Sequence, residues 1–264
     1  MKQQTNLKQQ IRLMLLTLLC GTGLAGPATA ESFLSWNKFS DATVRAATAP
    51  STWAPLAAAA VVSAGDWDHQ WQRSASKHQY LFGDDAEDTS NTLVTASTVL
   101  YGVSTLAAAP AGQGFQDSLG WKARNAAVML ADKALIDEIV GEWKEVSGRD
   151  RPDGIADDSL PSKHNATAAV QNTLTRRNLD YIEMHPHLRT LAKAGLYGLD
   201  GLTGIARMEA DKHYPTDVLV GMALGNFIAN LSYNLFLESE TSQTYSVAFV
   251  PTTDSLMVST QFVF

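Results

Sequence analysis

Three short segments of the sequence contain the residue types that can transfer a phosphoryl group. They are Lys144-Glu-Val-Ser-Gly-Arg-Asp-Arg151-Pro152, Pro161-Ser162-Lys163-His164 and Arg207-x5-His213-x3-Asp217. Three cationic side chains can bind the three non-bridging oxygens of a phosphoryl group, and a histidine oriented by a carboxylate can attack phosphorus. A second histidine can protonate the leaving oxygen, because imidazole titrates near neutral pH.

The spacing within the segments indicates which elements position these side chains. The first segment ends a long helical pattern, which a glycine and a proline close. Pro215 favours the first turn of a helix, so Asp217 can reach back to the imidazole of His213. Alone, each segment is more typical of a solvated helix end, a cap or a helix-surface pair. Only their joint occurrence predicts a catalytic site.

Together the three segments resemble the signature of the type 2 phosphatidic acid phosphatase superfamily, which reads Lys-x6-Arg-Pro, Pro-Ser-Gly-His and Ser-Arg-x5-His-x3-Asp. The match runs in order and spacing over residues 144 to 221. The family includes bacterial acid phosphatases, lipid phosphatases and vanadium-dependent haloperoxidases. The resemblance implies an all-α helical bundle and a phosphatase that uses no metal, acting on phosphate monoesters or lipid (di)phosphates.

The resemblance also implies a role for each matched residue. His213 is expected to be the nucleophile that forms a phosphohistidine, Asp217 its orienting partner and His164 the general acid. The residues expected to bind phosphate oxygens are Lys144, Arg151, Ser162, Lys163 and Arg207.

Two positions depart from the family pattern. Lys163 stands where the family has glycine; lysine keeps the backbone N–H that faces the phosphate, but its Cβ would be strained if the turn needed a positive φ. Ala206 replaces the serine before Arg207. We therefore expect the fold to be kept, and the activity level and the choice of leaving group to be the properties that these positions alter.

Two other functions fit the same pocket. A vanadate-dependent haloperoxidase would bind vanadate at His213, although chains of that kind are usually much longer. A homologue that binds phosphate or lipid without turnover would follow if Lys163 prevents catalysis. The leading expectation needs no cofactor, and vanadate enters only under the first alternative.

The first thirty residues are typical of a cleaved secretory signal peptide. Three basic residues precede an apolar run at Leu13–Leu19, and Ala28-Thr29-Ala30 supplies the small residues that a signal peptidase reads. An uncleaved anchor helix is less favoured, because the apolar run is shorter than the ~20 residues of a bilayer span. A lipid anchor at Cys20 is less favoured still, since leucine precedes it. We expect export, most simply to a periplasm.

The composition indicates an acidic globular chain. Of its 264 residues 45% are apolar and 18% charged, and the net charge is −7, or −10 once a leader with three basic and no acidic residues is removed. Such a chain lacks the basic surface that nucleic acid needs, so we expect a phosphate ester, free or lipid-linked, as its partner. Cleavage also removes Cys20, the one cysteine, which excludes disulfides and cysteine ligands from the mature protein.

Helical periodicity dominates from residue 91 onward. Apolar residues recur at three- and four-residue spacings over 91–109, 121–146, 164–175, 186–206 and 215–237. The last of these patterns is uncharged from Val218 to Leu237 and holds Gly221 and Gly225 four residues apart. It favours a central buried helix with close helix contacts over a transmembrane helix.

One phosphatase domain is expected over residues 31–264, with a helical core at about 91–237. At about 243–264 the apolar period changes to two, which predicts a short β-hairpin. The apolar helix beside the catalytic histidine and this apolar hairpin favour contact with a membrane surface. That contact should be peripheral, because a lone hairpin would leave backbone groups unpaired in hydrocarbon.

Other segments receive structural interpretations. Residues 56–64 read as a buried helix, and residues 65–88 as a solvated acidic loop rather than a metal loop. His185-Pro186-His187 has no third ligand nearby and is interpreted as a helix-start cap rather than a metal site. Arg149 is interpreted as a second-sphere or solvated residue, and the pair Arg176-Arg177 as an ordinary helix end.

Overall fold

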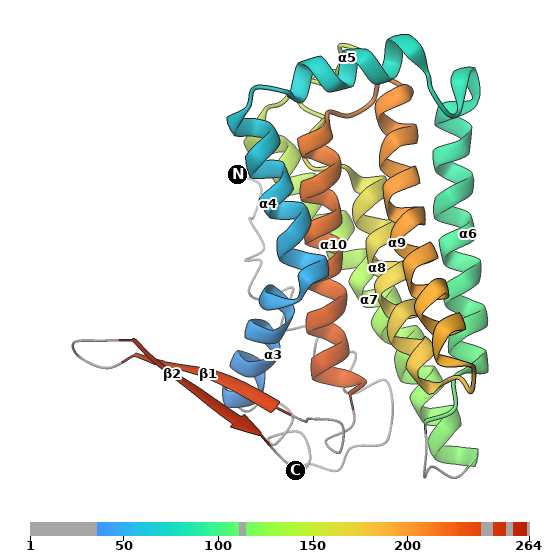
Figure 1. Cartoon of the computed structure of the whole chain (residues 1–264), viewed down its shortest axis with the longest axis vertical. Coiled ribbons are helices and arrows are strands. Elements are labelled where there is room, and N and C mark those ends of the chain that lie inside the picture. Colours follow the sequence, from blue (N-terminus) through green and yellow to red (C-terminus); the bar gives the residue numbers. More distant parts are fainter. Residues whose placement is uncertain (1–35, 111–114, 239–244, 252–255, 263–264) are drawn as a thin grey trace, which may run out of the picture.

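The computed structural model describes residues 36–110, 115–238, 245–251 and 256–262; the predicted signal peptide lies outside them. The helices are α3 (Trp36–Thr48), α4 (Pro50–Ala64), α5 (Asp68–His78), α6 (Ala86–Ala107), α7 (Phe115–Ser147), α8 (Lys163–Asn178), α9 (Pro186–Glu209) and α10 (Pro215–Phe236). Short 3-10 turns, η1 and η2, span Gly83–Asp85 and Leu179–Tyr181. The long helices run side by side, and α5 lies across one end of them (Figure 1).

The described residues between 36 and 238 form the all-α bundle that the sequence predicts, with α10 at its centre. This helix packs against α8, α4 and α3, and more lightly against α7. Its Ile228 and Tyr233 join Val170 of α8 and Ile136 of α7 in one apolar core. By length and composition alone α10 could cross a membrane, but 56% of its most apolar window is buried inside the bundle. The prediction of a central buried helix is confirmed.

Two glycines on α10 allow it to meet α8 closely. A Cβ at Gly221 would lie 2.5 Å from the carbonyl oxygen of Ser162, and one at Gly225 would collide with the carbonyl oxygen of Ala166. No larger residue fits without a shift of the backbone. The contact brings the start of α8 against the first turn of α10, where the Ser162 N–H donates to the carbonyl oxygen of Asp217 at 2.9 Å.

Two strands follow the bundle, β1 (Tyr245–Pro251) and β2 (Leu256–Phe262). They pair antiparallel, with Tyr245 opposite Phe262. The pair lies at the end of the bundle opposite α5, where β1 approaches α3 (Figure 1).

Two predictions for the N-terminal region are wrong. Residues 56–64 form the second half of α4, but they are not a buried helix, because Leu56 and Val61 are exposed and only Ala59 and Val62 are buried. Residues 65–88 are not a solvated loop, because they contain α5 and its buried Asp68. The apolar pattern does not reveal α5, because this helix is mostly polar and is held by charged contacts.

The arginines near the end of α8 are also not an ordinary helix end. Arg176 is buried and forms an ion pair with Asp200 of α9 at 3.2 Å. It also donates to the side-chain oxygen of Asn226 on α10, at 2.8 Å. Arg177 donates to Asn230 of α10 at 3.0 Å. Both arginines therefore join helices inside the bundle, which a sequence pattern cannot show.

Candidate active site

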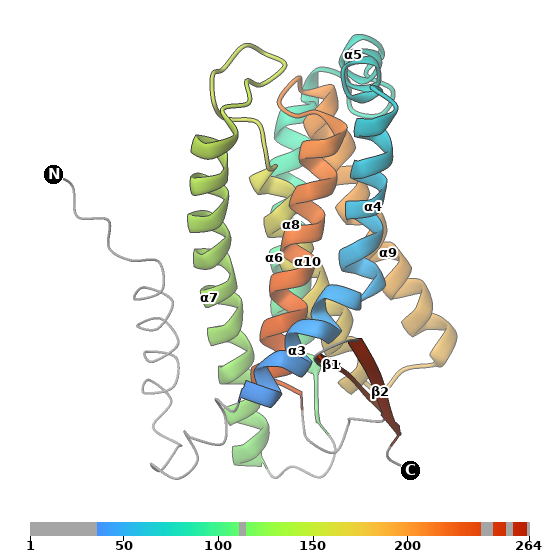
Figure 2. The same cartoon turned by 90° about the vertical axis from the view of Figure 1, so that its left-hand side faces the viewer.

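The three predicted segments meet at the end of the bundle where α5 lies (Figure 1). The loop between α7 and α8 rises over the same end in Figure 2. Lys144 lies at the end of α7, and Arg151 lies in this loop. His164 lies at the start of α8, Arg207 at the end of α9 and His213 in the turn before α10. Burial lowers the pKa of His164, and the positive charges of Arg207, Arg151 and Lys144 add to this effect, so these three cations lie near His164.

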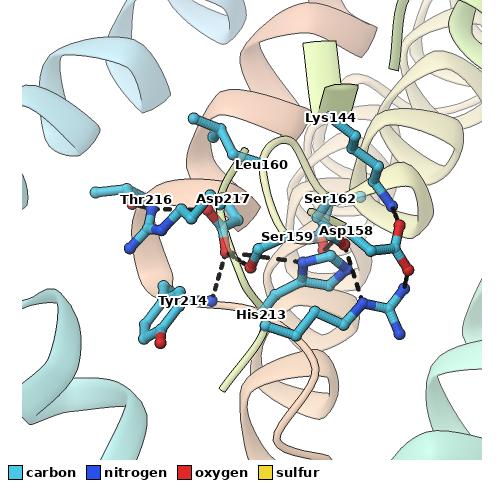
Figure 3. Close-up of polar contacts among 12 residues, drawn as sticks. Lys144, Asp158, Ser159, Leu160, Ser162, His213, Tyr214, Thr216 and Asp217 are labelled. Carbon is cyan, nitrogen blue, oxygen red and sulfur yellow. Dashed lines mark hydrogen bonds and ion pairs between the residues drawn. The ribbon is translucent and has the colours of Figure 1, made fainter. Parts of the chain in front are cut away.

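His213 is deeply buried, with a side chain 1% exposed, and lies beside Asp217 (Figure 3). Its Nδ1 is 3.8 Å from Oδ2 of Asp217, which is too long for a hydrogen bond, and this nitrogen has no hydrogen-bond partner among the described residues. Burial lowers the pKa of His213, the charge of Arg207 adds to this effect, and Asp217 opposes it. The imidazole is therefore kept neutral, as a nucleophile requires.

Asp217 is a heavily hydrogen-bonded carboxylate of the site. It accepts from Nη1 of Arg149 at 2.8 Å, from Oγ of Ser159 at 2.6 Å and from the backbone N–H of Tyr214 at 2.8 Å. Burial alone would raise the pKa of Asp217, but His213, Arg149 and the hydrogen bonds together lower it. The N–H of Tyr214 also belongs to a capping box that begins α10.

The sequence left open whether Arg149 supports the site from the second sphere or only faces solvent. In the structure Arg149 contacts Asp217, so it supports the site. Its Nη2 pairs with Oδ2 of Asp68 at 2.5 Å, and its guanidinium lies 4.2 Å over the ring of Tyr214. Asp68 in turn accepts the backbone N–H of Thr216 at 2.9 Å. Arg149 and Asp68 thus tie α5 to the first turn of α10. Sequence reasoning missed Asp68, whose only signal is its place at the start of a polar helix.

A second missed carboxylate, Asp158, joins two of the predicted phosphate ligands (Figure 3). Its Oδ1 is 2.5 Å from Nζ of Lys144, and its Oδ2 is 2.5 Å from Nη2 of Arg151. The Nε of Arg151 also donates to the backbone oxygen of Asp158 at 2.9 Å. Partial burial would raise the pKa of Asp158, but the two cations lower it below its usual range.

Arg207 is a buried cation with spare hydrogen-bonding capacity. Its Nη1 donates to Oγ of Ser90 at 3.2 Å, and its Nε has no partner among the described residues. Burial and the charge of Arg151 lower the pKa of Arg207 to about 10. A buried guanidinium with an unused donor is suited to an anionic oxygen.

His164 is neutral at ordinary pH. Its Nε2 is 2.8 Å from Oδ1 of Asn91 on α6. Burial, followed by the positive charges of Arg207 and its neighbours, lowers the pKa of His164 to about 4. A phosphate dianion among these cations would offset their charge and raise this pKa, which a general acid requires.

Ser162 immediately precedes α8, and Lys163 is the first residue of this helix. The φ of Lys163 is not positive, so its Cβ introduces no backbone strain. Its Nζ pairs with Oδ1 of Asp137 on α7 at 3.0 Å, and both side chains are well exposed. Ser162 is buried and its Oγ donates to Asn165 at 3.1 Å. The binding of phosphate by Ser162 and by the N–H of Lys163 stays a prediction.

The cap interpretation of His185 is confirmed, because its Nδ1 accepts the backbone N–H of His187 at 3.3 Å at the start of α9. In the part of the chain that the structure describes, no group of three or more His, Cys, Asp or Glu side chains is placed to hold a metal ion. A separate cavity of about 380 Å³ lies beside the site. It is lined by Glu87, Glu209 and Asp211 among others, so its charge does not favour phosphate.

Comparison with known proteins gives one family and two relatives. The family model described as PAP2 superfamily matches residues 119–240, which hold all three motifs. The lipid A 1-phosphatase of Porphyromonas gingivalis is 39% identical over 100 residues, which are 38% of this chain and 21% of the relative. The chain thus spans about a fifth of that relative. The crystal structure of a transmembrane PAP2-type phosphatidylglycerolphosphate phosphatase from Bacillus subtilis aligns with a TM-score of 0.39, 19% identity, and coverage of 62% of this chain and 91% of that one.

Proposed function

Because this chain belongs to the PAP2 superfamily through residues 119–240, we propose that it is an exported, metal-independent phosphatase that works through a phosphohistidine. The observation that carries the proposal is the buried, neutral His213 beside the ionised Asp217, with Lys144, Arg151 and Arg207 around them. The arrangement pairs a nucleophile with the cations that a phosphoryl group needs.

In the first step His213 attacks phosphorus. Its Nδ1 faces Asp217, so Nε2 is the nitrogen available to the substrate. The carboxylate favours the tautomer with the proton on Nδ1, which leaves the lone pair on Nε2. A bond forms between Nε2 and phosphorus while the bond from phosphorus to the ester oxygen breaks, and His164 gives its proton to that oxygen.

In the second step water attacks the phosphohistidine. His164, now neutral, accepts a proton from the water, and the bond between phosphorus and Nε2 of His213 breaks. Inorganic phosphate leaves and both histidines return to their starting states. Lys144, Arg151 and Arg207 bind the non-bridging oxygens throughout, where their charge matters most in the transition state.

The outer surface of the bundle favours a lipid-borne substrate and a peripheral contact with a membrane. On α4 the apolar side chains of Trp53, Leu56 and Val61 are exposed. On α6 the side chains of Val99, Leu106 and other apolar residues are exposed. Neither helix carries a charged residue in these stretches. Exposed apolar surface of this kind typically marks a contact site. The similarity to a lipid A 1-phosphatase supports the same substrate class.

Hydrolysis of a generic aryl phosphate in the presence of a chelator tests the proposed chemistry. We expect turnover that survives chelation and is blocked by vanadate, and a labelled, acid-labile, base-stable phosphoprotein on rapid quenching. His213→Ala should abolish both, while His185→Ala, which changes a histidine that caps α9 outside the site, should keep both. Label retained by His213→Ala would sink the nucleophile assignment. Activity that requires added vanadate would instead support a peroxidase.

A substrate panel and fractionation test location and substrate class. We expect lipid phosphates presented in vesicles to be better substrates than nucleotides or sugar phosphates, and the mature protein to be recovered with membranes and released by high pH. Recovery in the soluble periplasmic fraction with a preference for small esters would refute the membrane contact and leave the phosphatase chemistry standing.

A further inference from the structure

Asp158 lies where the negative charge of a substrate would be expected to lie. Each of its carboxylate oxygens contacts one cation of the predicted phosphate site, Oδ1 with Lys144 and Oδ2 with Arg151, both at 2.5 Å. A phosphoryl group would be bound in the same way, with two of its oxygens each contacting one of the two cations. The proposed mechanism gives Asp158 no step of its own.

The burial of the three side chains shows which of them can move aside. The side chains of Lys144 and Arg151 are 13% and 16% exposed, whereas that of Asp158 is 36% exposed. The carboxylate therefore lies on the solvent side of the two cations. It belongs to the loop between α7 and α8, next to Asp157, and can leave without disturbing a helix.

The charge of Asp158 reaches the rest of the site as well. Burial lowers the pKa of Arg207, and the negative charge of Asp158 opposes this effect. Without this carboxylate, three cations would face one another around the nucleophile. Asp158 therefore neutralises part of the phosphate site when no substrate is present.

We propose that Asp158 is an internal competitor that occupies the phosphate site of the free enzyme and is displaced by the phosphate group of the substrate. The inference rests on the proposed function for the identity of the ligand. A carboxylate carries one negative charge, so a dianionic phosphate monoester displaces it more readily than a monoanion does. Asp158 thus selects for terminal phosphates over phosphodiesters and carboxylates.

The opposite role is that Asp158 holds Lys144 and Arg151 in position for phosphate. The two roles predict changes of opposite sign when the charge is removed. A competitor weakens phosphate binding, so Asp158→Asn should bind phosphate more tightly. A positioning residue strengthens it, so the same variant should bind more weakly.

The test is titration calorimetry with inorganic phosphate on the mature protein, its Asp158→Asn and Asp158→Ala variants, and Asp153→Asn as the matched control. Asp153 lies on the same loop and its charge also opposes the lowering of the pKa of Arg207 by burial, but its ion pair is with Lys212, at 3.2 Å, so this control separates the direct contacts of Asp158 with Lys144 and Arg151 from a longer-range effect of charge. We expect about three- to tenfold tighter phosphate binding in both Asp158 variants and a change of less than about twofold in Asp153→Asn. The KM for an aryl phosphate should fall in parallel.

Unchanged, weaker or undetectable phosphate binding in the Asp158 variants overturns the inference. Calorimetry also separates this inference from the proposed function, because it needs no turnover. If the Asp158 variants bind phosphate more tightly but the protein hydrolyses no ester, the competitor role of Asp158 is supported and the proposed phosphatase activity is refuted. If the protein hydrolyses esters but the variants do not bind phosphate more tightly, the phosphatase activity is supported and the competitor role is refuted.

Discussion

Arg149 and Arg176 each pair with a buried aspartate and each lie over a tyrosine ring, but they stand in different parts of the bundle. At the catalytic end Arg149 pairs with Asp217 at 2.8 Å and lies 4.2 Å over Tyr214. Between α8 and α9, Arg176 pairs with Asp200 at 3.2 Å and lies 3.9 Å over a second tyrosine, Tyr197. The two side chains also differ in burial, being 25% and 6% exposed.

The two carboxylates respond differently to burial. It raises the pKa of Asp200, and the bonds from Arg176 and Asn172 only partly offset this effect. The pKa of Asp217 is lowered instead, because His213, Arg149 and further donors outweigh the same burial. The end of the bundle that holds the candidate site therefore surrounds its aspartate with enough donors to keep it charged beside His213, the proposed nucleophile. The inner pair joins two helices and has no such requirement.

Among the variants that test this comparison, Asp217→Asn should cause the largest loss of activity. The amide keeps the cap of α10 but no longer stabilises the positive charge that develops on the imidazole of His213, so we expect kcat to fall about 10³- to 10⁴-fold. Asp200→Asn in the inner pair should keep kcat within a few-fold. Steady-state kinetics on an aryl phosphate measures both, and equal losses in the two variants would erase the distinction between the pairs.

Arg176→Met should cause the largest loss of stability. It leaves the buried carboxylate of Asp200 without its cation, so the free energy of unfolding should fall by about 3–5 kcal/mol, while kcat of the folded protein is kept. Adding Asp200→Leu in the same chain should recover much of this loss, because no unpaired charge then remains. Urea denaturation measures the change. A single variant as stable as the parent would show that the pair does not stabilise the fold.

Arg149→Gln should have an intermediate effect on activity. It removes one donor to Asp217 and the contact with α5, so we expect kcat to fall about 10- to 100-fold, as for other residues that orient a catalytic ligand. Asp68→Asn should produce a loss in the same direction, and the double variant should lose less than the product of the two. Strictly multiplicative losses would mean that Asp68 does not act through Arg149.

The comparison also shows what the sequence can predict. His213, Asp217 and the cations are recognisable because the spacing within each of the three motifs is set along a short stretch of chain. The predicted helix at 215–237 closely matches α10, because its apolar pattern and Pro215 mark its bounds. Asp68 meets Arg149 across 81 positions of the sequence, and neither has a periodic pattern that records this contact. Polar contacts between distant segments therefore appear only in the fold.

The pH profile should show the depressed pKa of His213. Only the neutral imidazole attacks, and burial lowers the pKa of His213 from 6.5, so kcat/KM should fall on acidification only below that pH. Asp217 raises this pKa, so the residual activity of Asp217→Asn should have its acid limb at still lower pH. Both proteins are measured on one substrate, whose own ionisation is then common to the two profiles. A limb that moves to higher pH in the variant would contradict the assignment.

Lys163→Gly, which introduces the residue that the family has at this position, should have the smallest effect. The side chain of Lys163 turns to Asp137 on α7, and an ion pair as exposed as this one contributes at most about 1 kcal/mol to stability. The backbone N–H that is predicted to bind phosphate is kept when glycine replaces lysine, so we expect kcat/KM to change less than about threefold. Asp137→Asn is the matched control, because it frees Lys163 without altering the turn before α8. A tenfold loss in Lys163→Gly with no change in Asp137→Asn would show that the lysine side chain itself reaches the phosphate.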